Sequence, residues 1–250
     1  MKALLITLFL ATNALAAGTS GFGLQVLVSG EPRPEYNARG NLYVEAVRGS
    51  EYSLRVTNPT PYRVAVALTV DGLNTIDAKH TDPRRASKWV LEPYESTVIS
   101  GWQVSEGSAR SFFFTGERDS YGNALGQTQN LGVIEAVFFR ERHREVTVIA
   151  PRMETQSGAA KDEKRAPSPS ASAAPPSDDY AATGMGDKMR NEVQSVDIDL
   201  ERTPVASVRI RYEFRQQLVK LGVLPRRESQ LDRRERAKGF EPFCPEVARQ

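Results

Sequence analysis

The sequence predicts an all-β protein: a two-sheet antiparallel sandwich, immunoglobulin-like or jelly-roll-like, with a docked C-terminal hairpin and one short helix. From Gly23 to Ala150, short runs rich in Val, Tyr, Phe, Ile and Thr alternate with turns rich in Gly, Pro, Asn and Asp. These runs are too numerous, and the helical patterns between them too few, for a parallel α/β fold. Two packed sheets would bury the apolar faces of such strands.

The clearest strand pair covers residues 52–57 and 62–70, which are joined by the turn-forming string Asn-Pro-Thr-Pro. Both runs alternate with period two, and in the second run the face opposite the large side chains carries Ala65 and Ala67. Alanine is small enough for that face to lie beneath another layer. The other predicted strands are residues 24–28, 42–47, 88–91, 96–104, 111–115, 131–139 and 145–150.

The first sixteen residues have the pattern of a secretory signal peptide. A lysine at position 2 precedes an apolar run, and Ala14-Leu15-Ala16 gives a small-x-small cleavage pattern. The apolar run is shorter than the roughly 20 residues that cross a bilayer, so we expect no transmembrane segment. The expected location is exported, either periplasmic or extracellular. Cys244 is the one cysteine, so an intramolecular disulfide cannot form.

Composition divides the remainder into four parts. We expect a sandwich domain at 17–150, a disordered Pro/Ser/Ala-rich linker or insertion at 151–191, a β-hairpin and short helix at 192–225, and a charged flexible tail at 226–250. The string TGMGDK, residues 183–188, is interpreted as a hinge at the end of the linker, because it lacks the third glycine and the preceding strand of a phosphate-binding loop.

The predicted C-terminal hairpin has two alternating strands. Val196, Ile198 and Leu200 alternate with acidic residues, and the apolar side chains of residues 208–214 alternate with Arg209, Arg211 and Glu213. A two-stranded hairpin needs an apolar surface to cover, so it should dock on the sandwich of its own chain or of a neighbour. Residues 214–221, followed by a glycine, have the spacing of a short helix with a glycine C-cap.

The charge balance bears on the class of partner. The chain has 33 basic and 31 acidic residues and a net charge of +2, which gives no electrostatic case for nucleic acid. No Gly-x-Ser-x-Gly elbow occurs, and Cys244 has no histidine near it in sequence. We therefore expect no catalytic residues, no bound cofactor and no enzyme activity, although paired carboxylates on a sandwich rim stay open.

The turn after residue 70 carries Asp71, Asn74, Asp77 and His80, with Asp82 beyond. This spacing does not match a calcium loop, and a zinc site would have to borrow His143 and further carboxylates. Asp-Gly is also what a plain turn requires, because glycine readily takes positive φ. We interpret Asp71-Gly72 as a structural corner and expect no metal site, with a bound ion as the alternative.

Three aromatic residues, Trp89, Tyr94 and Trp102, lie within one strand-turn-strand region and are the candidate contact surface. Exposed tryptophans can stack on sugars or on side chains of a partner, because their flat faces offer a large contact area. The competing interpretation is that both tryptophans fill the space between the sheets.

Two long stretches resemble a group of uncharacterised secreted bacterial proteins that are usually labelled hypothetical. The first runs from VAVALTVDGLNTID through SGWQVS to NLGVIEAVFFRE, and the second is TGMGDKMRNEVQSVDIDLERTPVASVRIRYEFRQQLVKLGVLP. The resemblance covers most of the part expected to be ordered. It implies a bacterial exported protein and carries no assigned activity or catalytic residues.

Three functional hypotheses follow. The first is an exported, non-catalytic β-sandwich module of the bacterial envelope that binds another envelope protein or a polysaccharide through the sandwich rim and the Trp89 to Trp102 region. The second is a carbohydrate-binding module with exposed, coplanar Trp and Tyr faces. The third is a metal-assisted hydrolase in which Asp71, Asp77 and His80 converge. The ligand and the oligomeric state are left open.

Overall fold

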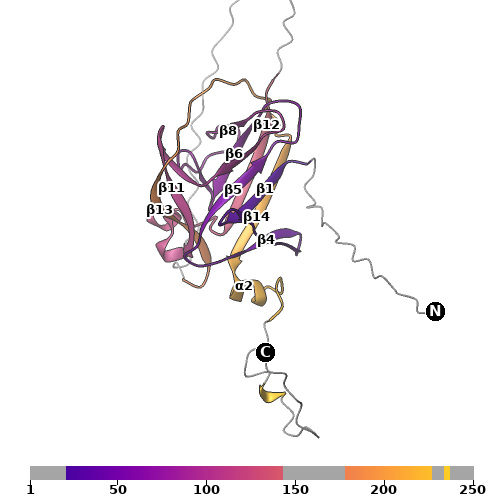
Figure 1. Ribbon diagram of the computed structural model, residues 1–250, viewed down its shortest axis with the longest axis vertical. Helices are drawn as coiled ribbons and strands as arrows, with labels where there is room; N and C mark the ends of the chain where they lie inside the picture. The colour runs from indigo at the N-terminus through magenta and orange to yellow at the C-terminus, as the bar shows by residue number, and fades with distance from the viewer. Residues whose placement is uncertain (1–20, 143–177, 227–233, 237–250) are drawn as a thin grey trace, which may run out of the picture.

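The strands of the protein form two seven-stranded sheets that pack face to face, as the computed structural model shows (Figure 1). The structure describes residues 21–142, 178–226 and 234–236. The first sheet has the order β10-β11-β5-β1-β2, with β13 added to β11 and β9 to β5. The second has the order β3-β4-β14-β12-β6-β7, with β8 added to β6. The predicted two-sheet sandwich is confirmed.

The strands are short and follow the alternating pattern of the sequence. Those of the first sheet are β1 (Gly23–Val28), β2 (Glu31–Pro32), β5 (Glu51–Thr57), β9 (Ser96–Ile99), β10 (Gly101–Ser105), β11 (Ser108–Gly116) and β13 (Ala181–Arg190). Those of the second are β3 (Glu35–Ala38), β4 (Asn41–Ala46), β6 (Val64–Val70), β7 (Leu73–Asn74), β8 (Trp89–Leu91), β12 (Val133–Arg140) and β14 (Ala206–Phe214). The helices are η1 (Glu117–Asp119), α1 (Tyr121–Ala124) and α2 (Arg215–Lys220).

The main core lies between the two sheets and is formed by the side chains that point inward from the strands. On β6 the inner face carries Val64, Val66, Leu68 and Val70, all fully buried. The outer face of the same strand is covered as well, because Ala67 belongs to a second apolar cluster with Ala86, Val137 and Phe139, against which Leu200 packs. The expectation that the alanines of this strand lie beneath another layer is confirmed.

The prediction that residues 196–214 form a separate C-terminal hairpin is wrong. Strand β14 forms, but it pairs antiparallel with β12 and parallel with β4, in the middle of the second sheet. In Figure 1 this yellow-orange strand lies between β12 and β4. Residues 191–199 form no strand, and Leu200 makes an isolated bridge to Glu141. Because β14 is paired along both of its edges inside the sheet, Ile210 and Tyr212 are buried. A two-stranded hairpin lying outside the sandwich could not bury them in this way.

The predicted linker also ends earlier than residue 191. Residues 181–190, which include the supposed hinge TGMGDK, form the long strand β13 against β11. Two glycines of this strand leave no room for a side chain. A Cβ on Gly184 would lie 2.2 Å from the Phe113 ring, and one on Gly186 would lie 2.4 Å from Ser111 Oγ. Strand β13 is thus part of the sandwich. The last residues of the predicted linker and the C-terminal segment therefore belong to the same folded body as the sandwich.

The short C-terminal helix is confirmed as α2, and Gly222 follows it with a φ of 71°. Leu218 and Leu224 pack on Tyr43 in a small third cluster. No helix within the described ranges is long and apolar enough to cross a membrane. The signal peptide, the strand predicted at 145–150, most of the predicted linker and most of the tail lie outside the described residues.

Candidate functional site

Residues 191–200, here called the strap, cross the edge of the sandwich from β13 toward the end of β12 (Figure 1). Its first end is fixed by Asn191, whose amide donates to Gln103 Oε1 at 2.7 Å and whose carbonyl accepts from Gln103 Nε2 at 3.0 Å. At the second end the Arg142 N–H donates to the Asp199 carbonyl at 2.7 Å, and the Glu201 N–H donates to the Arg140 carbonyl at 2.9 Å. The strap is therefore anchored to both sheets.

Between these anchors the strap is held weakly. From Gln194 to Ile198 its backbone and side chains make no hydrogen bond to any described residue. Val196 is 52% exposed, so its aliphatic side chain is accessible from solvent. The middle of the strap thus has both unpaired backbone groups and an accessible apolar side chain.

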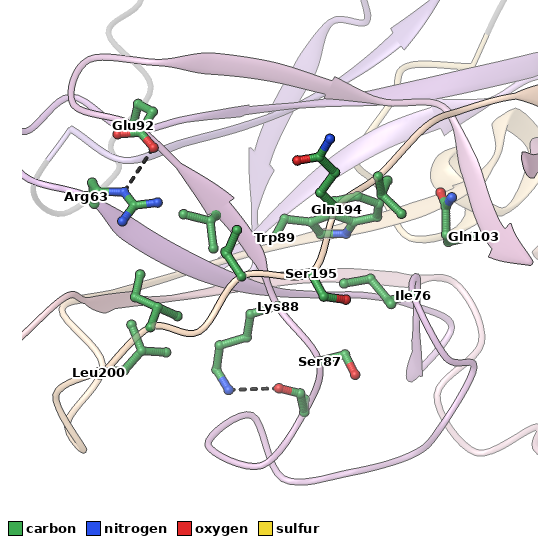
Figure 2. A pocket seen from close by; sticks show the side chains of 15 residues that line it. Arg63, Ile76, Ser87, Lys88, Trp89, Glu92, Gln103, Gln194, Ser195 and Leu200 are labelled. Atoms are coloured by element: carbon green, nitrogen blue, oxygen red, sulfur yellow. Dashed lines mark hydrogen bonds and ion pairs between the residues drawn. The ribbon is translucent and has the colours of Figure 1, made fainter. Parts of the chain in front are cut away.

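A cavity of about 600 Å³ lies beneath the strap, and we call it the Trp89 groove. On the sandwich side, its apolar lining comes from Ile76, Ala86, Trp89 and Val90, and its polar lining comes from Arg63, Ser87, Lys88, Glu92 and Gln103. The strap contributes Val193, Val196, Ile198 and Leu200 to the opposite wall. Figure 2 shows the Trp89 ring beside the strap residues Gln194 and Ser195. The groove has a size and an apolar lining that suit a ligand-binding site.

The orientation of Trp89 is fixed from behind. Strand β8 pairs with β6 through Trp89 and Val66, and the indole Nε1 donates to Thr75 Oγ1 at 2.9 Å. Thr75 is itself buried, and its N–H donates to the Leu68 carbonyl. The indole N–H is thus satisfied inside the protein. The ring is half-buried and packs in part against the main core, and the remainder of its carbon surface lines the groove.

Charged groups flank this apolar wall (Figure 2). Arg63 Nε lies 2.9 Å from Glu92 Oε1, and its Nη1 lies 3.4 Å from Glu141 Oε1. Lys88 instead donates to the backbone carbonyls of Arg84 and Ala86, at 3.0 and 2.8 Å. Partial burial lowers the pKa of Lys88 from its ordinary value, and Asp82 opposes that shift. Arg63 is therefore neutralised by carboxylates, whereas Lys88 is held by neutral oxygens.

The three aromatic residues predicted as one contact surface lie in three different environments. Trp89 lines the groove, but Trp102 is only 2% exposed and donates its indole N–H to the Gly184 carbonyl at 3.2 Å. Trp102 also packs edge-on against Phe112, with ring centroids 5.1 Å apart. Tyr94 is 68% exposed and lies in the turn after β8, away from the groove lining. Trp102 is therefore not part of a contact surface, and the competing interpretation holds for it: it fills the core between the sheets.

The acidic and imidazole groups of the 71–82 region do not form a cation site. Asp77 accepts from Ser87 Oγ at 2.9 Å, His80 Nδ1 lies 3.0 Å from the Gly72 carbonyl, and Asp82 caps its own turn through the Arg84 N–H. Among the described residues no group of three or more His, Cys, Asp or Glu is placed to hold a metal ion. His143 and Cys244 lie outside the described residues.

Asp71 and Gly72 form the predicted corner, with φ angles of 54° and 75°. The side chain of Asp71 nevertheless has a larger role, because it is buried between the sheets. Its Oδ1 accepts from the Gly132 N–H at 2.8 Å and from the Tyr212 hydroxyl at 2.5 Å, and its Oδ2 accepts from the Thr183 N–H at 2.7 Å. Three separate chain segments thus meet on one carboxylate.

Burial raises the pKa of Asp71 from 3.8 to about 7, although the bonds from Tyr212, Thr183 and Gly132 favour the anion and oppose this shift. The pKa values of Tyr212 and Tyr52 are also raised, first by burial and then by the charge of Asp71. The Thr183 hydroxyl lies 2.6 Å from the Tyr212 hydroxyl and 2.7 Å from that of Tyr52. A continuous chain of hydroxyl groups therefore leads from Asp71 on the second sheet to Tyr52 on the first.

Neither the strap nor the buried role of Asp71 is easily predicted from the sequence. The strap has the same period-two alternation as a strand, so its unpaired state depends on a partner strand that the sequence cannot show. Asp71 carries a weak signal, since it directly follows the seven residues of β6, six of them apolar and buried, and stands before a glycine. Its hydrogen-bond partners come from residues 61, 112 and 141 positions away along the chain.

The fold and the groove define a β-sandwich module with a strapped apolar cleft at one sheet edge. Comparison with known proteins adds no assignment: no family model matches the chain, and neither a curated protein nor a solved structure is significantly similar to it.

Proposed function

We propose that this protein is an exported, non-catalytic binding module of the bacterial envelope, and that it binds another envelope protein in the Trp89 groove. The observation that carries the proposal is the groove itself, an apolar cavity of about 600 Å³ between Trp89 and a strap whose middle is unbonded within the described chain. Such a cleft buries a ligand surface without needing new secondary structure in the protein.

The polar groups around the groove support binding in preference to catalysis. Arg63 is paired with Glu92, and Gln103 is paired with Asn191, so each is occupied in holding the walls of the groove together. A catalytic acid or base would have to face the position of a reacting atom with a free proton or lone pair. The proposal of export is supported by the signal-peptide pattern in residues 1–16 and by the resemblance to secreted bacterial proteins.

Carbohydrate binding is supported less well, because it calls for several exposed aromatic faces in one plane. Trp102 is part of the core and Tyr94 lies outside the groove, which leaves Trp89 as one partly buried ring with its nitrogen bonded to Thr75. The hydrolase alternative has no convergence of Asp71, Asp77 and His80 to support it, since each bonds to a different partner.

Site-specific cross-linking in the native cells tests the proposal. A photoreactive phenylalanine analogue placed at Val196, on the exposed middle of the strap, should give a discrete cross-linked product. The same analogue at Tyr94, which is more exposed but outside the groove, is the matched control. The product should disappear when the Val196 probe is combined with Trp89→Ala. Equal labelling from both positions, or no product from either, would contradict the proposal.

A further inference from the structure

The Trp89 groove is bordered by one free strand edge and by one segment of the strap whose backbone groups have no partner in the described chain. Strand β8 pairs with β6 along one edge, and its other edge meets no described strand. Across the groove, the strap makes no backbone hydrogen bond from Gln194 to Ile198. Unpaired strand edges of this kind accept an added strand, because main-chain bonds supply affinity that does not depend on sequence.

From this arrangement we propose that the ligand of the groove is an extended peptide segment that adds to the free edge of β8, presses an apolar side chain on Trp89 and places a carboxylate at Lys88. This inference rests on the proposed function and names the class of ligand for that same site. The unpaired part of the strap is five residues long, from Gln194 to Ile198, which at roughly 3.3 Å per residue suits an extended segment of about 16 Å.

The apolar side chains in the walls of the Trp89 groove indicate which peptide residues the groove would select. The lining includes apolar side chains from the sandwich (Ile76, Trp89 and Val90) and from the strap (Val196 and Ile198). Successive side chains of an extended peptide point to opposite sides, so every second residue would face the wall of the sandwich. Apolar residues at alternate positions are therefore the pattern that this groove selects.

The proposal of a ligand carboxylate at Lys88 follows from the charges in the groove lining. Of the two cations in the lining, Arg63 already has Glu92 and Glu141 within ion-pair distance. Lys88 has no carboxylate within that distance among the described residues, and its ammonium group donates to two backbone carbonyls. An ammonium carries three N–H donors. Besides the two carbonyl bonds, Lys88 Nζ lies 5.1 Å from the centre of the Phe139 ring, so a ligand oxygen would compete with that ring for the third donor. A carboxylate there would neutralise a partly desolvated charge, which makes the bond stronger than one at an open surface.

Selection from a library of displayed seven-residue peptides tests the inference on the whole mature protein. The Trp89→Ala variant serves for counter-selection, so that peptides bound elsewhere are removed. We expect the enriched sequences to alternate apolar residues and to carry an Asp or Glu at one fixed position. Enrichment of sequences without a carboxylate, or without alternation, would overturn the inference.

The enriched peptide then allows two sharper measurements. Lys88→Met should weaken its binding about tenfold or more, as expected for loss of a charge-assisted bond. Lys79→Met is the matched control and should leave binding unchanged, because Lys79 is exposed and outside the groove lining. A peptide N-methylated at alternate backbone positions should bind at least tenfold more weakly. Equal binding of the methylated peptide, or equal loss in both lysine variants, would contradict strand addition at Lys88.

The two proposals can fail separately. If the library gives no enrichment while the cross-link from Val196 persists and still depends on Trp89, the groove binds a partner but not through a short extended peptide. In that case this inference falls and the proposed function stands. If both the selection and the cross-link are negative, both fall.

Discussion

The Tyr212 hydroxyl donates a hydrogen bond of 2.5 Å to Asp71 Oδ1, and this bond lies inside the core of the sandwich. Tyr212 comes from β14 in the middle of the second sheet, while Asp71 begins the turn after β6. The Thr183 hydroxyl extends the contact to Tyr52 on the first sheet. One buried carboxylate thereby connects both sheets, and its position explains why the stretch from β13 to β14 is needed to complete the fold.

The hydroxyl chain can accommodate either charge state of Asp71. With the carboxylate ionised, Tyr52, Thr183 and Tyr212 can each donate to the next oxygen, ending at Asp71. With Asp71 protonated, the same chain can run in the opposite direction, because each hydroxyl both donates and accepts. Protonation therefore does not require the network to break, which is consistent with a pKa of Asp71 near 7.

Stability should fall as the pH rises from about 4 to about 7. The pKa of Asp71 is about 7 in the folded protein and near 3.8 when exposed, so the folded state binds the proton more tightly. Its stabilising effect is complete below pH 3.8 and is lost as the pH rises through 7. At 1.36 kcal/mol per pH unit the total change is roughly 4 kcal/mol. Urea unfolding followed at several pH values measures it.

The matched control for this effect is Asp71→Asn. Glu35 and Glu213 also have raised pKa values because of burial, that of Glu213 reaching about 6, so they contribute with the same sign. The difference between the parent and the Asn variant isolates Asp71. We expect the variant to be less stable at acidic pH, because an amide N–H₂ would face backbone donors, and to have a much flatter pH profile. A parent profile that rises between pH 4 and 7 would contradict the assignment.

Tyr212→Phe should raise the pKa of Asp71 further. The hydroxyl of Tyr212 stabilises the ionised carboxylate, so its removal shifts the protonation equilibrium toward the acid. The loss of stability with pH should then extend to higher pH than in the parent, as read from the same urea titrations. Tyr43→Phe is the control, since Tyr43 is also buried but gives no bond to Asp71. A profile unchanged by Tyr212→Phe alone would show that the hydroxyl does not govern the titration.

Strands with strong local signals were predictable from the sequence. Strand β6 has alternating large side chains and two alanines, and in β14 the apolar residues Ile210 and Tyr212 alternate with charged ones, so both were recognised as strands. The short helix α2 was recognised from its spacing and from Gly222. These features depend on neighbouring residues along the chain, which is why a sequence is enough to show them.

Features that depend on distant partners were not predictable. Strand β13 is rich in Gly, Ala and Met, residues that rarely mark a strand, and it exists because Gly184 and Gly186 fit against β11. The strap shows the converse, since Val196, Ile198 and Leu200 alternate perfectly yet have no partner strand among the described residues. Of the candidate contact residues, Trp89 could be named in advance, whereas the strap that completes its groove could not.

Gly101→Ala should be strongly destabilising. A Cβ at this position of β10 would lie 2.0 Å from the Arg110 carbonyl oxygen of the paired strand β11, and a backbone atom cannot move aside as a side chain can. We expect a loss of about 1–3 kcal/mol or more, as for overpacking in a core. Gly107→Ala is the control, because nothing lies within 4 Å of its Cβ position. Similar unfolding free energies for both variants in urea would contradict the close approach of β10 and β11.

Trp102→Ala should cost about 3–5 kcal/mol, as does truncation of a large aromatic residue in a core. The substitution removes the edge-on contact with Phe112 and leaves the Gly184 carbonyl without its indole donor. Tyr94→Ala, in contrast, should change the unfolding free energy by no more than about 0.5 kcal/mol, because that side chain is 68% exposed. Thermal and urea unfolding of the two variants separate these outcomes. If Trp102→Ala is as stable as Tyr94→Ala, Trp102 is not a core residue, and its place on the contact surface would have to be restored.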